Sequence, residues 1–188
     1  MTDKPQQIYD QRHMQRVIRR MAGELVERHQ GAKELLLVGI RTRGVPLAEA
    51  LAQEIESMEG SVVPLGTLDI TLYRDDLSTI APQPIVRKTE LPGSLDGKTV
   101  VLCDDVLFTG RTIRAALDAL MDFGRPKAVR LAVLIDRGGR ELPIQGDIVG
   151  ERLEVGEREL VDVHFADTDD GPEGIYMRPS NGDSGDQG

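Results

Sequence analysis

Residue types that bind phosphate and sugar are most concentrated in Val100–Thr112, which reads VVLCDDVLFTGRT. Four apolar residues lead directly into the acids Asp104 and Asp105, and Thr109 begins the sequence Thr-Gly-Arg-Thr. Carboxylates accept hydrogen bonds from sugar hydroxyls or bind magnesium. Free backbone N–H groups at a helix start, with threonine hydroxyls beside them, bind phosphate. The segment therefore predicts a site for a ribose 5-phosphate, whereas an Asp-Asp pair alone more often just ends a strand.

Three arginines in two other segments suit a second phosphate group. Arg41 and Arg43 follow the apolar run 34–40, and Arg74 begins the Pro-, Gly- and charge-rich segment 74–97. A guanidinium offers forked donors that match phosphate oxygens. A loop as long as 74–97 is typical of a lid or of a disordered segment. The alternative for Arg41 and Arg43 is a solvated basic turn, but their position after a buried strand favours binding.

A regular frame must hold these segments together. Apolar residues recur with helical spacing between Met14 and Val26, and several short continuous apolar runs are typical of strands covered on both faces. Their alternation predicts an α/β fold built on a doubly wound parallel sheet, which binds ligands at the carboxyl ends of its strands. We expect helices over 14–26, 45–57 and 112–123, and strands over 34–40, 62–72, 99–103, 128–135 and 160–165.

Length and composition indicate one domain and limit its partners. The 188 residues predict a single domain over 1–166, followed by an acidic, partly disordered tail over 167–188. The net charge is −9, and an acidic chain is a poor general binder of nucleic acids. The one cysteine, Cys103, excludes an internal disulfide. Without an apolar run of about 20 residues or a signal-peptide core, we expect a cytoplasmic protein with no membrane partner.

The segment Val100–Thr112 resembles the phosphoribosyl-pyrophosphate (PRPP) motif of type I phosphoribosyltransferases. Three other segments resemble one subfamily, the PyrR family of pyr operon attenuators and uracil phosphoribosyltransferases. They are VGIRTRG at Val38–Gly44, DITLYRDDLS at Asp69–Ser78 and DRGGRELPI at Asp136–Ile144. The resemblance covers residues 8–165 and implies the type I fold, with a small hood and a long flexible loop. It also implies conversion of uracil and PRPP to UMP and pyrophosphate, with Mg²⁺ bound together with PRPP.

The resemblance also implies a role for each matching position. Asp104, Asp105 and Arg74 would be catalytic. Ribose 5-phosphate would be bound by Asp104, Asp105, Val106, Leu107, Phe108, Thr109, Gly110, Arg111 and Thr112. Pyrophosphate would be bound by Arg41, Thr42, Arg43, Gly44 and Arg74. Asp136 and Arg137 would lie in the hood over the base, and the Mg²⁺ ligands would come from Asp104, Asp105 and Asp136.

Members of the subfamily also bind pyr leader mRNA in response to UMP or UTP, through a basic face formed by a dimer. The resemblance thus implies a homodimer or higher homo-oligomer whose RNA face draws on Arg16, Arg19, Arg28, Arg41 and Arg140. The chain has Gly23 and Gly139 where related members commonly carry histidine, and Gln145 and Glu151 near positions that are commonly basic.

Two alternative functions stay open at this point. One is a protein that mainly regulates through RNA and uses the PRPP fold as a nucleotide sensor. The other is a purine phosphoribosyltransferase, which the PRPP motif alone does not exclude.

Overall fold

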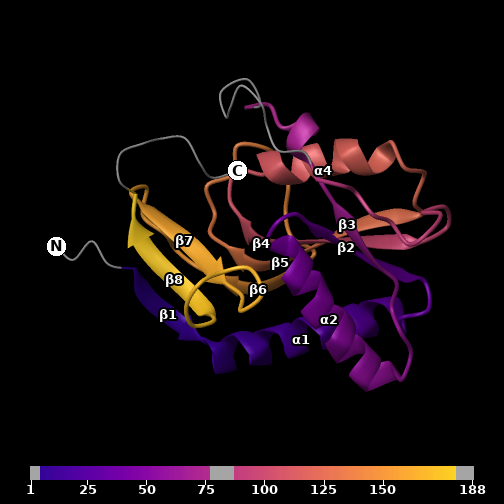
Figure 1. The fold of residues 1–188 in the computed structure, drawn as a ribbon, viewed down its shortest axis with the longest axis horizontal. Helices are drawn as coiled ribbons and strands as arrows, with labels where there is room; N and C mark the ends of the chain where they lie inside the picture. Colours follow the sequence, from indigo (N-terminus) through magenta and orange to yellow (C-terminus); the bar gives the residue numbers. More distant parts are fainter. Residues whose placement is uncertain (1–4, 77–86, 181–188) are drawn as a thin grey trace.

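The computed structural model describes residues 5–76 and 87–180 (Figure 1). Its centre is a five-stranded sheet in the order β3-β2-β4-β5-β6, in which every neighbouring pair is parallel. The strands are β2 (Leu35–Ile40), β3 (Leu65–Leu68), β4 (Thr99–Leu107), β5 (Ala128–Asp136) and β6 (Ile148–Arg152). The chain winds outward from β2 to β3 on one side and from β4 to β5 on the other. The predicted doubly wound parallel sheet is therefore confirmed, and its topological switch point lies between β2 and β4.

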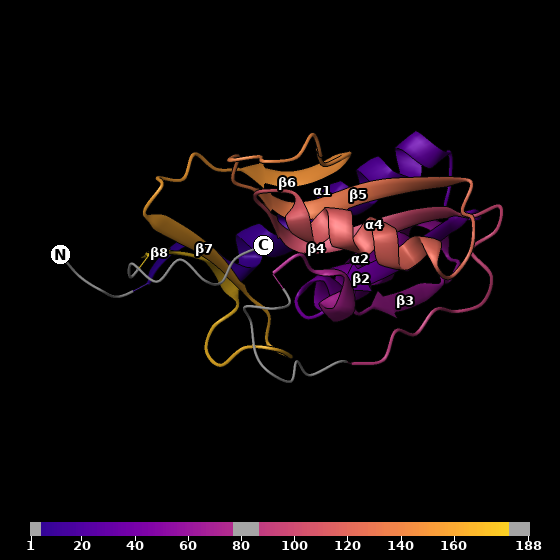
Figure 2. The same cartoon turned by 90° about the horizontal axis from the view of Figure 1, so that it is seen from above.

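Helices cover both faces of this sheet. Figure 1 shows α1 (Gln11–His29) and α2 (Gly44–Glu59) on one side and α4 (Arg111–Met121) on the other, and Figure 2 shows α4 lying across the strands. Successive side chains of β2 alternate between the two faces. Leu35 and Leu37 pack with α1 and α2, while Leu36 and Val38 pack with α4. This explains why β2 is apolar throughout.

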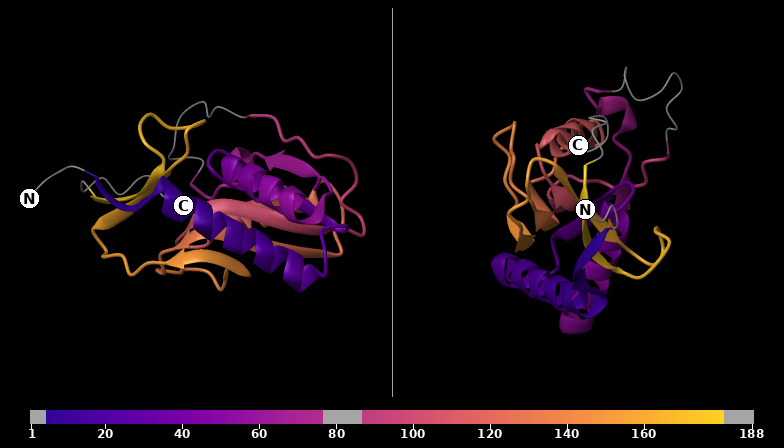
Figure 3. Two further views of the ribbon diagram at one scale, coloured as in Figure 1. Left: turned by 90° about the horizontal axis from the view of Figure 1, so that it is seen from below. Right: turned by 90° about the vertical axis from the view of Figure 1, so that its left-hand side faces the viewer.

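A second, three-stranded antiparallel sheet stands beside the first (Figures 2 and 3). It has the order β1-β8-β7 and consists of β1 (Gln6–Asp10), β8 (Gly174–Pro179) and β7 (Glu159–His164). We call this sheet, with the turn 165–173 between β7 and β8, the hood. Val161, Val163 and Ile175 are buried in the same core cluster as α1 and α2. The hood is thus packed onto the domain rather than attached by a linker.

Several predicted boundaries were wrong. The strand expected over 62–72 ends at Leu68, because Thr71–Tyr73 forms a 3₁₀ turn (η1) in which Leu72 is 60% exposed. The strand expected to end at residue 103 continues to Leu107, so both acids belong to β4. No strand was expected between the strands over 128–135 and 160–165, yet β6 lies there.

The predicted tail also differs from the structure. Residues 174–179 form β8 and pair with strands on both sides, so the folded domain does not end at residue 166. The acidic composition around β8 made its six residues look like part of a tail, although Ile175 is fully buried. Residues 181–188 of the tail, and 77–86 of the expected lid, lie outside the described residues. Within the described part of the chain, no helix combines the length and the apolar character needed to cross a bilayer.

The packing of β8 gives a first test. We expect Ile175→Ala to lower the free energy of unfolding by about 2–5 kcal/mol, because it removes buried methyl groups and leaves a cavity. Met58→Ala serves as the control, since Met58 is 44% exposed. Urea unfolding curves would measure both variants. If Ile175→Ala and Met58→Ala lowered the free energy of unfolding by the same small amount, β8 would have no structural role.

Candidate active site

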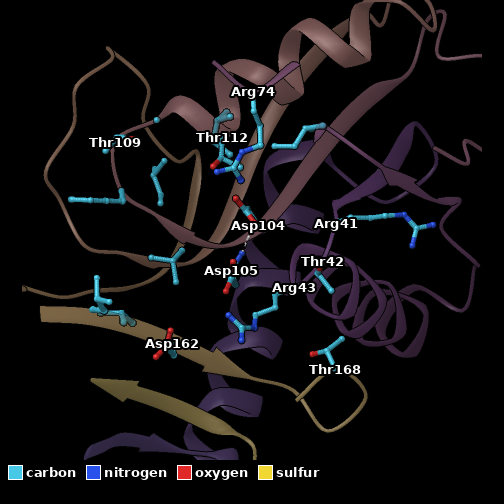
Figure 4. Close-up of a pocket in the computed structure, with 18 of the residues that line it drawn as sticks. Arg41, Thr42, Arg43, Arg74, Asp104, Asp105, Thr109, Thr112, Asp162 and Thr168 are labelled. Atoms are coloured by element: carbon cyan, nitrogen blue, oxygen red, sulfur yellow. Dashed lines mark hydrogen bonds between the residues drawn. The ribbon is translucent and has the colours of Figure 1, made fainter. Parts of the chain in front are cut away.

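A cavity of about 740 Å³ lies at the switch point between β2 and β4 (Figure 4). Four regions line it: the loop that follows β2, the segment after β3 with Ile70 and Arg74, the end of β4 with the start of α4, and the hood. The carboxyl ends of β2 and β4 meet at one edge of the sheet, and the side chains that leave them converge there. The sequence-predicted residues that line the cavity are Arg41, Thr42, Arg43, Arg74, Asp104, Asp105, Val106, Leu107, Phe108, Thr109, Gly110 and Thr112.

The two acids of β4 differ in their surroundings. Asp104 is only 7% exposed, and one of its oxygens accepts a hydrogen bond from the backbone N–H of Asp105 at 3.0 Å. Burial, and then the charge of Asp105, raise the pKa of Asp104 well above its usual value. Burial also raises the pKa of Asp105, while the positive charge of Arg43 opposes that rise. A further positive charge in the cavity would stabilise the ionised form of both acids.

The loop from β4 to α4 has the features of a phosphate site. Gly110 has a left-handed backbone (φ 92°) that glycine adopts without strain, and it directly precedes α4. The Thr109 hydroxyl accepts a hydrogen bond from the backbone N–H of Arg111 at 3.3 Å. The Thr109 carbonyl accepts two more, from the N–H groups of Glu141 and Leu142. The loop is therefore held from two sides, and the start of α4 lies at the cavity.

The loop after β2 is held against β4. Gly44 is buried, and a side-chain Cβ at this position would overlap the carbonyl oxygen of Cys103. Glycine is thus required for close packing here. Arg41 donates to the carbonyl of Lys88 at 3.2 Å and to the Thr67 hydroxyl at 3.0 Å.

Arg43 points toward the hood. It donates to Asp169 through Nε and Nη2, with a shortest distance of 2.7 Å. The hydrogen bonds to Asp169 raise the pKa of Arg43.

Some predicted residues do not line the cavity. The Arg111 side chain turns away to Glu141 at 2.6 Å and Asp75 at 2.9 Å. Asp136 forms an ion pair with Arg140 at 2.7 Å, and its carboxylate also accepts a hydrogen bond from the backbone N–H of Gly138.

Arg137 lies behind the cavity wall rather than in the hood. It is buried, with its guanidinium 4.1 Å from the centre of the Phe108 ring, and it donates to the Glu159 carbonyl at 2.9 Å. Nε and Nη1 of Arg137 are buried without a hydrogen-bond partner among the described residues.

The arginines expected to form an RNA face are scattered. Arg16, Arg19 and Arg28 lie on α1, and the last two pair with Glu54 and Glu24. Arg41 belongs to the cavity. Arg140 is engaged by Asp136 and by the carbonyls of Ile144 and Phe108.

Sequence reasoning missed the hood side of the cavity. The missed lining residues that are polar are Asp162, Thr168, Asp169, Arg178 and Ser180. Arg178 pairs with Asp162 at 2.5 Å. The one signal for this wall was the alternation of apolar and polar residues in 160–165, because the charged residues that follow have the composition of a tail.

Comparison with known proteins agrees with this geometry. The model of the phosphoribosyl transferase domain matches residues 5–161, so the chain belongs to that domain family. The hypoxanthine phosphoribosyltransferase of Trypanosoma cruzi has the same fold: the TM-score is 0.70 at 16% identity, over 93% of this chain and 97% of the other. The hypoxanthine-guanine phosphoribosyltransferase of Bacillus anthracis also has a TM-score of 0.70 at 16% identity, over 95% and 99%.

Much closer relatives carry the name "Bifunctional protein PyrR". The one from Pelotomaculum thermopropionicum is 57% identical over 169 residues, which cover 90% of this chain and 93% of the relative. The one from Deinococcus radiodurans is 52% identical over 90% of this chain and 92% of the relative. The chain is a member of the PyrR family.

Because Asp104 is buried, we expect that replacing its carboxylate by a neutral group lowers activity but raises stability. The native carboxyl binds its proton more tightly than the unfolded one, so stability falls as pH rises from about 4 toward the native pKa. We expect Asp104→Asn to abolish activity yet raise the urea midpoint at pH 8, with the gain shrinking toward pH 4. The exposed Asp170→Asn is the control. An Asp104→Asn variant that is less stable than wild type at pH 8 would contradict this account.

Proposed function

We propose that the protein is a uracil phosphoribosyltransferase that converts uracil and PRPP to UMP and pyrophosphate. One observation carries the proposal: the adjacent acids Asp104 and Asp105 and the start of α4 line the same cavity as Arg41 and Arg43. A ribose between them would have its 5-phosphate at α4 and its pyrophosphate at the arginines. The high identity to bifunctional PyrR proteins selects uracil as the base. The neighbours that act on hypoxanthine are 16% identical and support only the fold.

The reaction replaces one bond at the anomeric carbon by another. The bond to the pyrophosphate oxygen breaks, the bond to N1 of uracil forms, and the N1 proton is released. Positive charge develops on the ribose in between, and Asp104 and Asp105 would stabilise it. Arg41, Arg43 and Arg74 would bind the leaving pyrophosphate. No protein nucleophile is required, so catalysis consists of positioning and electrostatics.

A magnesium ion fits this site only together with its substrate. Among the described residues, no group of three or more His, Cys, Asp or Glu side chains could hold a metal by itself. Two adjacent carboxylates plus pyrophosphate oxygens are a usual ligand set for Mg²⁺. Asp104 and Asp105 are the residues we propose for this role, and the ion would neutralise leaving-group charge. Asp136 is less suited, because Arg140 already occupies its carboxylate.

For the base, we propose a pocket between Phe108 and the start of β7. Phe108, Leu160 and Val161 line the cavity, and Arg137 contacts both walls from behind. Arg137 would keep Phe108 against the base rather than touch PRPP. The alternative function for a protein with this pocket is a purine phosphoribosyltransferase. An assay of base selectivity decides between uracil and purine as the substrate.

We further propose that the protein binds pyr leader mRNA in response to UMP or UTP, as a homodimer or higher homo-oligomer in the cytoplasm. The support is membership of a family whose members are called bifunctional. Arg16 and Arg19 lie close together on the exposed surface of α1, while Arg28 lies on the opposite side of the helix from Arg19. A side chain at position 139 would overlap the Phe108 ring, and Gly139 has φ 72°, so glycine fits this position and offers RNA no side chain there. We therefore expect weaker RNA binding than a fully basic face would give.

The enzymatic proposal predicts base-selective turnover. Purified protein should form UMP from uracil and PRPP, and EDTA should abolish the reaction. Hypoxanthine, guanine and orotate should give no product in the same assay. Detectable UMP binding without any turnover would overturn the enzyme and favour the nucleotide sensor. Turnover of hypoxanthine or guanine in place of uracil would favour the purine enzyme.

The regulatory proposal predicts RNA binding that depends strongly on salt. Titration of a pyr leader RNA at several salt concentrations should give weak binding at physiological salt, strengthened by UMP. Arg16→Ala should lower affinity and reduce the slope of log K against log salt by about one. Arg125→Ala, an exposed arginine beyond the end of α4, is the control. Tight UMP-dependent binding at physiological salt, unchanged in Arg16→Ala, would contradict this assignment.

A further inference from the structure

One ion pair joins the loop 41–43 to the hood. Arg43 donates from Nε and Nη2 to Asp169, with distances of 3.2 and 2.7 Å to the same carboxylate oxygen. The Asp169 side chain is only 10% exposed. Among the described residues, this is the only hydrogen-bonded side-chain link between that loop and the hood. A bidentate guanidinium–carboxylate pair fixes orientation as well as charge, so the direction of Arg43 is set from the hood.

Asp169 is itself held in place. Its Oδ2 accepts from the backbone N–H of Phe165 at 3.1 Å and from the Thr168 hydroxyl at 2.8 Å. Burial would raise the pKa of Asp169, but the bonds from Arg43, Thr168 and Phe165 outweigh it and lower that pKa. The carboxylate is therefore charged and cannot follow Arg43 if the arginine moves. It is an anchor on the hood.

Two other acids compete for the same guanidinium. Figure 4 shows the Arg43 guanidinium between Asp105 and Asp162, and both acids interact electrostatically with it. Asp105 is half-buried beside the buried Asp104, so a cation that paired with Asp105 directly would relieve an unfavourable charge. Asp162 already has a partner in Arg178. Without Asp169, Asp105 would be the strongest remaining attraction for Arg43, and that pairing would cover the carboxylate proposed to face the ribose.

We propose that Asp169 is a positioning residue for the pyrophosphate site: it anchors Arg43 on the hood side, away from Asp105 and ready for phosphate oxygens. Among residues 5–76 and 87–180, no hydrogen bond involves Nη1 of Arg43, so this nitrogen stays available while Nε and Nη2 are held. The inference rests on the proposed function, since it assumes that the arginines of this cavity bind pyrophosphate. Asp169 would not touch the reacting atoms and acts through Arg43.

The variant that tests this is Asp169→Asn, which keeps an oxygen acceptor for the turn but loses the charge that holds Arg43. Asp167→Asn is the matched control: it removes the same charge from the same turn, and Asp167 is exposed, with no hydrogen bond or ion pair from its carboxylate to another described residue. We expect Asp169→Asn to raise the KM for PRPP by about tenfold. The KM for uracil and the melting temperature should match those of Asp167→Asn. Unchanged KM for PRPP, or tighter binding because Asp169 had competed with the substrate, would overturn the proposal.

A double-mutant cycle separates positioning from a loosened hood. In an Arg43→Met background, Asp169→Asn should not raise the KM for PRPP any further, because the guanidinium that Asp169 positions is gone. If Asp169→Asn raised the KM for PRPP equally in wild type and in Arg43→Met, Asp169 would act only on the hood, and the proposal would be wrong.

Calorimetric titration with magnesium pyrophosphate and with PRPP makes the test independent of turnover. Weaker binding by Asp169→Asn supports the inference even if wild type forms no UMP, in which case the proposed function fails alone. Wild-type protein that binds neither ligand would overturn both.

Discussion

The constraint on which the rest of the cavity depends is a pair of adjacent carboxylates near the end of β4, of which Asp104 is buried and Asp105 half-buried. Asp104 is nearly inaccessible, and burial raises the pKa of both acids. Charges in such a place are unfavourable unless positive charge approaches them. Among the described residues, Arg43 is the cation whose charge opposes the rise in the pKa of Asp105, yet the hydrogen bonds of Arg43 go to Asp169. In the proposed reaction, the positive charge that develops on the ribose would meet these carboxylates.

The sheet topology explains why the opposing groups meet at this point. The chain leaves β2 in one direction and β4 in the other, which opens a crevice between two neighbouring strands. Gly44 lets the loop after β2 pack directly on β4, so Arg43 starts close to the acids. Gly110 turns the chain into α4, so free backbone N–H groups also start there. Two glycines therefore place the arginines and the start of α4 on either side of the carboxylates.

The sequence alone predicted this half of the site well, because its residues follow strands in short, ordered segments. The loop after β2, the acids and the start of α4 could all be located from a buried run and the residues that follow it. The hood wall could not, since β7 and β8 pair across a turn rich in acids and Asp169 looks like part of a tail. Arg111 and Asp136, in contrast, do not line the cavity. Their chemistry suits the cavity, but nearby opposite charges, Glu141 and Arg140, hold them away from it.

The same competition between charges bears on regulation. An acidic domain that binds RNA needs arginines that are not already paired, and most of those expected here are. Arg140 is fixed by Asp136 and two carbonyls, and Arg41 belongs to the cavity. Gly139 cannot acquire a side chain unless Phe108 moves, and Phe108 is a wall of the proposed base pocket. In this chain a side chain at position 139 and the Phe108 ring would occupy the same space, so a residue introduced there would require Phe108 to shift within the proposed base pocket.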